Sequence, residues 1–246
     1  MLLLHGFLGS GRNLHSLARR WNERESRLRL ILPDLTGHGI SPPLEEPVSI
    51  NGVARDVLSL AEHVKADEPL TIVGHSFGGR TALAMRLLDP SRVGRIVLLD
   101  IAAGPIGTGL GGLDGVLAKL LEAPATSRDR DSLRAFFQSR GISAALTEWV
   151  ILNLVQDGDV LRWRFNREAL KALNEASRVV DLWPAVEAPG VNTTLIYGAR
   201  SKFVALADLD RFMSTNADVI AIPNAGHFLH VDAQAELLDH LVALKL

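Results

Sequence analysis

The residues GHSFG at positions 74–78 place a serine between two glycines, a spacing typical of a nucleophile on a sharp turn. An apolar run ends immediately before them at 70–73, and a helical pattern covers 76–88. In so tight a turn, side chains two residues on either side of the serine would collide with backbone, and glycine removes the Cβ atom. We therefore predict that Ser76 is a nucleophile at a strand tip, beside a helix N-terminus that favours negative charge.

A serine hydroxyl is a poor nucleophile until a base removes its proton. The sequence contains eight histidines, and His227 is the one that directly follows the last predicted strand, in PNAGHFLH. Loops at the carboxyl ends of strands are where a parallel sheet gathers its functional residues. His230, three residues later, is expected to begin the C-terminal helix. We predict that His227 is the base.

The base needs an acid that fixes its tautomer and stabilises the imidazolium. RIVLLDIA places Asp100 at the end of the strand that follows the serine turn, whereas TLIYGARSKFV has Ser201 where an acid would be expected. Asp208 and Asp210 lie further on, in a predicted helix. We therefore predict Asp100 as the acid. The alternative is that Asp100 only caps a turn.

Backbone N–H groups are predicted to hold the oxyanion that forms on the substrate. HGFLGS follows the first predicted strand, and Gly6 lets the backbone approach closely, so the N–H of Phe7 can point into the site. The N–H of Phe77, next to the nucleophile, is its expected partner. Losing one such donor typically costs about 3 kcal/mol. His5 and His38 are expected to be structural.

Short apolar runs alternate with amphipathic stretches along most of the chain. This alternation predicts a mostly parallel central sheet with helices on both faces, an α/β fold. The predicted strands cover residues 2–5, 28–33, 70–74, 95–100, 193–198 and 218–223. The predicted helices cover residues 13–22, 50–64, 76–88, 206–214 and 233–244.

The alternation stops between residues 104 and 189, where no strand pattern is found. We predict a glycine-rich loop at 104–115, and then a helical cap inserted after the strand that ends at Asp100. The predicted division is a core of 1–103 and 190–246 and a cap, or lid, of 104–189. The alternative is a second helical layer with no part in binding. The helices expected in the cap cover 116–121, 132–140 and 143–154.

Six aromatic side chains of the cap are candidates for an apolar acyl pocket under the lid. The alternative is that these rings fill the cap's own core. The six are Phe136, Phe137, Trp149, Trp163, Phe165 and Trp183.

Composition excludes several other functions. The chain has 246 residues, a net charge of −2 and no cysteine. So small a charge gives no electrostatic reason to expect binding to nucleic acid or to a membrane. Without cysteine there is no disulfide, thiolate metal site or cysteine nucleophile. No apolar run is long enough to span a membrane, and the opening residues lack a signal peptide's basic region, so we expect a cytoplasmic protein.

Four motifs together resemble the α/β-hydrolase superfamily. They are HGF at 5–7, DLTGHG at 34–39, GHSFGG at 74–79 and GH at 226–227, and they are similar to the superfamily in order and spacing over nearly the whole chain. The superfamily usually has one or two strands before the His-Gly strand, and here only four residues precede His5. We therefore expect these strands to be missing and one edge of the sheet to be exposed.

LLDIA with Asp100, and YGARSKFV with Ser201, resemble a narrower branch that includes the YbfF-type and ABHD11-type esterases. In that branch the acid follows the strand just after the nucleophile, and a serine or similar residue fills the other position. The resemblance implies a serine esterase acting on short to medium acyl chains, with a small-molecule ester as its partner and neither metal nor organic cofactor. The oligomeric state is left open.

Three alternatives to an esterase are left open. An acyl-CoA thioesterase would use the same residues and favour a basic entrance. A C–C hydrolase or lyase of this fold normally has its acid after the later strand, where this chain has Ser201. A small-molecule sensor would bind without turnover. The candidates for a basic entrance are Arg128, Arg130, Arg134 and Arg140.

Overall fold

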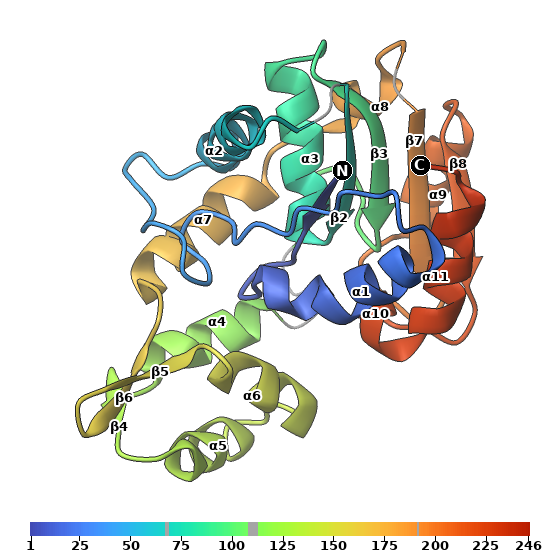
Figure 1. Ribbon diagram of the computed structural model, residues 1–246. Helices are drawn as coiled ribbons and strands as arrows, with labels where there is room; N and C mark the ends of the chain where they lie inside the picture. The colour runs from blue at the N-terminus through green and yellow to red at the C-terminus, as the bar shows by residue number, and fades with distance from the viewer. Residues whose placement is uncertain (67–68, 108–112, 191) are drawn as a thin grey trace.

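A five-stranded, all-parallel sheet forms the centre of the computed structural model, which describes residues 1–66, 69–107, 113–190 and 192–246. Its strand order is β1-β2-β3-β7-β8, so the carboxyl ends of all five strands lie at one edge (Figure 1). Five of the six predicted strands are confirmed. They are β1 (Leu2–Leu4), β2 (Leu70–His75), β3 (Val93–Leu99), β7 (Asn192–Gly198) and β8 (Asp218–Ile222).

Alternate residues of the strands enter two separate cores because successive side chains point to opposite faces. Ile96 and Leu98 belong to the core beneath α2 and α3, whereas Val97 and Leu99 belong to the core beneath α1 and α11. The near-continuous apolar runs therefore reflect a sheet covered on both faces. The core helices are α1 (His15–Arg24), α2 (Ile50–His63), α3 (Phe77–Leu88), α9 (Leu206–Met213), α10 (Leu229–Asp232) and α11 (Gln234–Ala243).

The predicted strand at 28–33 is wrong. Ile31 alone pairs with β1, accepting the N–H of Leu3 at 2.9 Å and donating its own to Met1 at 3.1 Å. The ladder cannot continue past Pro33, which has no N–H to donate. This half-buried segment covers part of the outer edge of β1, the edge strand of the described sheet, so that edge is less exposed than expected.

The cap contains a small sheet that was not predicted from the sequence. Strands β5 (Leu154–Asp157) and β6 (Val160–Trp163) form an antiparallel hairpin, and β4 (Thr126–Ser127) pairs with β6. Two residues join the hairpin, and Gly158 takes a φ of 60°, a left-handed conformation typical of such turns. The predicted helix 143–154 therefore ends early, as α6 (Ala144–Ile151).

The cap helices are α4 (Leu113–Glu122), α5 (Arg130–Gln138), α6, α7 (Arg167–Arg178) and α8 (Trp183–Glu187), of which α7 and α8 were not predicted. Helices α4, α5 and α6 lie around the small sheet and form a lobe below the main sheet, whereas α7 and α8 lie along the core, α7 against α2 and α8 against α3 (Figure 1). Asp129 caps α5 by accepting the N–H of Ser132 at 2.7 Å. Residues 104–107 form no helix or strand, and residues 108–112 of the predicted loop lie outside the described residues.

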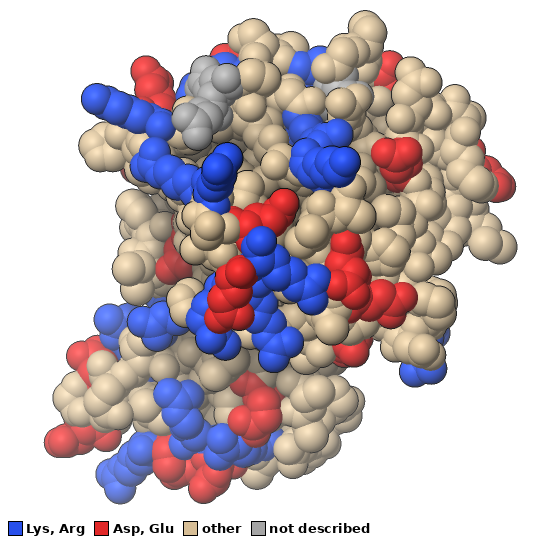
Figure 2. All heavy atoms as spheres, turned by 45° about the vertical axis from the view of Figure 1, so that its right-hand side comes forward, with Lys and Arg blue, Asp and Glu red and all other residues tan. Residues whose placement is uncertain are grey.

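Basic and acidic side chains alternate over the face shown in Figure 2, with no extended patch of one sign. This mixture agrees with the small net charge of −2. Within the described ranges, no helix has the length and apolar character that crossing a bilayer requires.

Candidate active site

Ser76 lies on a strained turn between β2 and α3. Its φ of 52° and ψ of −117° are rare for a residue with a side chain, and such strain costs roughly 1–3 kcal/mol. A Cβ atom on Gly74 would lie 2.5 Å from the backbone of Gly78, and one on Gly78 would lie 2.3 Å from the carbonyl oxygen of Leu4. Only glycine fits these two positions, so the glycine spacing is explained by close backbone contact.

Asp100 and His227 are joined by a hydrogen bond of 2.7 Å between the carboxylate Oδ2 and the ring Nδ1. The Asp100 carboxylate is fully buried, directly after β3, and His227 lies in the loop after β8. Gly198 donates its N–H to Asp100 Oδ1 at 2.9 Å. The acid is therefore fixed from both sides, with one oxygen toward the histidine.

Ser201 contributes a third contact to this acid. Its hydroxyl donates to Asp100 Oδ2 at 2.5 Å and also accepts the N–H of Phe203 at 3.2 Å. The ring of Phe203 stacks on His227, with 3.7 Å between ring centres and 18° between planes. The loop after β7 therefore supplies a hydroxyl for the acid and a flat surface for the histidine.

Ser76 and His227 line one pocket of about 130 Å³. No hydrogen bond joins the two side chains in the described part of the chain. Nucleophile and base are often separated without substrate and approach when it binds. The structure thus brings Ser76, His227 and Asp100 to one site, but the side chains of Ser76 and His227 are not hydrogen-bonded to each other.

The N–H groups of Phe7 and Phe77 have no acceptor among the described residues, as an oxyanion hole requires. Both side chains are buried, and their rings meet edge to face at 5.4 Å. His5 holds the preceding loop, since its Nε2 accepts the N–H of Leu35 at 2.9 Å and its Nδ1 donates to Gly6 at 2.8 Å. His5 is thus structural, as its position predicts.

Of the six predicted pocket aromatics, the structure brings only Trp149 to the pocket of Ser76 and His227. Phe136, Phe137 and Trp163 pack within the cap. The ring centre of Phe137 lies 5.3 Å from that of Phe136 and 6.1 Å from that of Trp163. Phe165 stacks on Trp163, and Trp183 packs on Phe212 of α9. These five rings do not line the pocket because the cap and α8 need them for their own packing.

Four ring-bearing side chains of the pocket were not predicted from the sequence. His75, Phe203, Phe228 and His230 line the same pocket as Ser76. Two of them are direct sequence neighbours of the predicted Ser76 and His227, a signal that could have identified them. Nothing in the sequence pattern marks Phe203 except its place after Ser201.

Four buried histidines surround the site and are held neutral. Burial lowers the pKa of His5 to about 4, of His38 to about 3 and of His230 to about 4. Burial also holds the pKa of His75 well below its usual range, and the neighbouring His227 and His230 lower it further. His75 donates its Nε2–H to the backbone oxygen of His227 at 2.8 Å, and so positions the loop of the predicted base.

These histidines make the protein less stable in acid. Between pH 6.5 and about 4, the unfolded chain binds protons that folded His5, His38 and His230 exclude. The free energy of unfolding therefore decreases as the pH is lowered, by about 1.4 kcal/mol per pH unit for each histidine. Urea unfolding at several pH values measures this slope. His38→Phe, which keeps a ring beside Phe7, should reduce this slope by the contribution of one proton. An unchanged slope would contradict the lowered pKa of His38.

Arg80 of α3 ties the core to the cap. Its Nη1 donates to the carbonyls of Ala102 and Gly104 at 3.4 and 2.7 Å, and its Nη2 to Ser177 and Val180 at 3.0 and 2.6 Å. The side chain is buried, which lowers its pKa to about 10. One guanidinium thus joins the beginning of the insertion to the end of α7.

Replacing Arg80 by leucine should destabilise the protein by about 3–5 kcal/mol, since buried carbonyls lose their donor. For a chain of this length, this corresponds to a fall in Tm of roughly 10 °C, measured by calorimetry. Arg19→Leu is the matched control, because Arg19 is exposed and pairs with the exposed Glu23. Equal Tm values for the two variants would show that Arg80 does not hold the cap.

No group of three or more His, Asp or Glu side chains is arranged to hold a metal ion within the described ranges. The arrangement that does form is a serine on a strained turn, a histidine bound to a buried carboxylate and two free N–H groups.

Known proteins match this chain over nearly its whole length. A family model described as "Alpha/beta hydrolase family" matches residues 1–240. The chain is 30% identical over 248 residues to the Mus musculus protein named "sn-1-specific diacylglycerol lipase ABHD11", covering 97% of this chain and 78% of that protein. It is 27% identical over 238 residues to "Esterase YbfF" of Escherichia coli (strain K12), covering 94% of this chain and 87% of that protein. The solved structure of a "Marine microorganism esterase" is similar, with a TM-score of 0.85 at 23% sequence identity, covering 98% of this chain and 93% of that one.

Proposed function

Because this chain belongs to the alpha/beta hydrolase family, we propose that it hydrolyses carboxylic esters with Ser76, His227 and Asp100 as a catalytic triad. The observation that carries the proposal is the 2.7 Å bond between Asp100 and His227 at the pocket of Ser76. Relatives named esterase or lipase support the reaction type. The similarity to the esterase structure supports the fold.

In the proposed reaction, Ser76 Oγ attacks the ester carbonyl while His227 Nε2 takes the hydroxyl proton. The N–H groups of Phe7 and Phe77 hold the oxyanion. When the tetrahedral intermediate collapses, His227 returns the proton to the leaving alcohol, and the acyl group stays on the serine. His227 then deprotonates a water that attacks the acyl group, and it returns this proton to Ser76 Oγ as the bond to the serine breaks and the acid leaves. Asp100 keeps its charge and stabilises the imidazolium throughout.

The proposed substrates carry short to medium acyl chains. The pocket has a volume of about 130 Å³, and Val116, Leu146, Trp149 and Phe228 give it apolar walls. A second hollow of about 40 Å³ reaches Ser76 from the side of Ile101 and Ile106. Two hollows that meet at the nucleophile suit an ester, whose acyl and alcohol parts extend in different directions.

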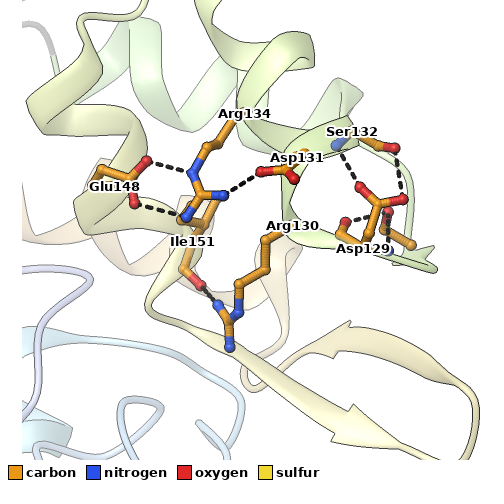
Figure 3. Close-up of polar contacts among 8 residues, drawn as sticks. Asp129, Arg130, Asp131, Ser132, Arg134, Glu148 and Ile151 are labelled. Atoms are coloured by element: carbon orange, nitrogen blue, oxygen red, sulfur yellow. Dashed lines mark hydrogen bonds and ion pairs between the residues drawn. The ribbon is translucent and has the colours of Figure 1, made fainter.

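Of the four arginines suggested for the basic entrance of a thioesterase, none lines the pocket of Ser76, and three are engaged in contacts within the cap. Arg134 binds Glu148 and Asp131, and Arg130 donates to the carbonyl of Ile151 (Figure 3). Arg140 lies over the ring of Phe136, 3.7 Å from its centre. These three cations hold the cap together, so they do not favour a thioesterase over an esterase.

Covalent labelling tests the proposal. One fluorophosphonate should add to each protein molecule, and the adduct should map to Ser76. The rate of hydrolysis of p-nitrophenyl esters, from acetate to dodecanoate, should fall in proportion to the fraction of protein labelled. The best acyl length among these esters measures the pocket. Hydrolysis by fully labelled protein, or an adduct on another serine, would refute the proposed nucleophile.

A further inference from the structure

A polar groove adjoins the catalytic pocket on the side of the cap. Its volume is about 240 Å³, and it shares Gly9, Asn13 and Trp149 with the pocket of Ser76. A substrate held at Ser76 can therefore extend past Trp149 into it. We call it the mouth groove. Its other lining residues are Leu8, Ser10, Arg12, Leu152, Asn153 and Arg164.

The mouth groove carries two positive charges and no negative one. Arg12 is exposed and Arg164 is half-buried, and no carboxylate lines the groove with them. Neither arginine forms an ion pair with a described residue, in contrast to Arg134, which binds two carboxylates. The Nε of Arg164 is buried and has no hydrogen-bond partner in the described ranges. Two unpaired guanidinium groups thus remain in a chain whose net charge is −2.

The backbone around both arginines is fixed against the loop of the proposed oxyanion hole. Arg164 donates its N–H to Asn153 O at 2.9 Å, and Asn153 Nδ2 donates to Leu8 O at 2.9 Å. On the core side, Asn13 follows Arg12 and accepts the N–H of Ser10 at 2.6 Å. Arg164 also borders a smaller hollow of about 110 Å³ near Gly37. An anion between the arginines would contact core and cap together.

We propose that the mouth groove binds an anionic group, a carboxylate or a phosphate, at the end of the substrate remote from the ester bond. The inference rests on the proposed function, since it names the substrate class of that same site. Guanidinium groups bind carboxylates and phosphates through charge-assisted, often paired hydrogen bonds. The apolar pocket then accepts the part next to the ester, and the mouth groove accepts the charged end.

Matched substrate pairs test this inference. Monoethyl adipate against ethyl hexanoate places a carboxylate on the acyl side. Butyryl-CoA against the butyryl thioester of N-acetylcysteamine places phosphates on the leaving-group side. For at least one pair, kcat/KM should be about 10-fold higher for the anionic member. The preference should weaken from 0.05 to about 0.5 M NaCl because salt screens exposed charges. The pair that responds identifies the source of the anion.

Variants at the two arginines link the preference to the mouth groove. Arg12→Gln and Arg164→Gln should each lower the ratio of anionic to neutral kcat/KM several-fold, and the double variant should abolish it. Arg164→Lys should retain part of it, because the charge remains. Arg19→Gln, on an exposed arginine paired with Glu23, is the control and should leave the ratio unchanged. A wild-type ratio near one for both pairs would overturn the inference and leave the proposed esterase intact.

Binding to Ser76→Ala separates failure of this inference from failure of the proposed function. Calorimetric titration of Ser76→Ala with adipate and with free coenzyme A requires no turnover. One of the two probes should bind to Ser76→Ala, and this binding should be lost when Arg12→Gln and Arg164→Gln are introduced as well. That result would support the anion site even if no ester is hydrolysed. Absence of binding by both probes, together with equal hydrolysis of anionic and neutral esters, would overturn it.

Discussion

Ser76→Ala is expected to reduce kcat for p-nitrophenyl ester hydrolysis by about 10⁶-fold, the loss seen when a serine hydrolase loses its nucleophile. The variant keeps the strand, the turn and the two N–H donors of the proposed oxyanion hole, so binding and polarisation of the ester should continue. What it loses is the oxygen that forms the acyl-enzyme. The remaining rate should be that of water attack in an organised pocket.

Ser214→Ala provides the control, because Ser214 lies at the exposed end of α9, remote from the catalytic pocket. Its kcat should equal that of the wild type. The Tm of Ser76→Ala should also match the wild type, since alanine keeps the unusual backbone angles of residue 76 and adds no unpaired group. A Ser76→Ala enzyme that retains more than about a hundredth of the activity would show that another residue is the nucleophile.

The parts of the site that could be predicted from sequence are those dictated by backbone geometry. Gly74 and Gly78 had to be glycine because any Cβ would collide with backbone, so the turn left a readable pattern around Ser76. Asp100 ends one apolar run and His227 lies in the loop after another, and strand ends meet at one edge of a parallel sheet. Their contact at 2.7 Å follows from strand order more than from any property of the two residues.

The parts that could not be predicted depend on contacts between distant segments. Arg80 looked like an ordinary helical arginine, yet its four acceptors come from residues 102–104 and 177–180, which the insertion brings together. Trp163 and Trp183 looked like pocket residues because aromatic content does not tell a ligand-facing ring from a core ring. The hairpin at 154–163 was missed because no strand pattern was found between residues 104 and 189, although its Gly158-Asp159 turn was readable.

Asp100→Asn is expected to lower kcat about 10⁴-fold while the fold stays intact. The side chain introduced by Asp100→Asn can still accept the N–H of Gly198 through Oδ1, which places its NH₂ group toward Ser201 and His227. The Nδ1 of His227 must then accept a hydrogen bond instead of donating one. Its proton moves to Nε2, the nitrogen that has to receive the proton of Ser76. The loss therefore comes from the wrong tautomer of His227.

Two controls separate this explanation from a general effect of charge or packing. Asp210→Asn makes the same chemical change on an exposed residue of α9 and should leave kcat unchanged. Ser201→Ala removes one donor to Asp100 but leaves the carboxylate and its bond to His227, so kcat should fall no more than about 10-fold. If Asp100→Asn fell no further than Ser201→Ala, the acid would lie elsewhere. If it falls a thousandfold further, the carboxylate acts through the tautomer, and Ser201 only holds it in place.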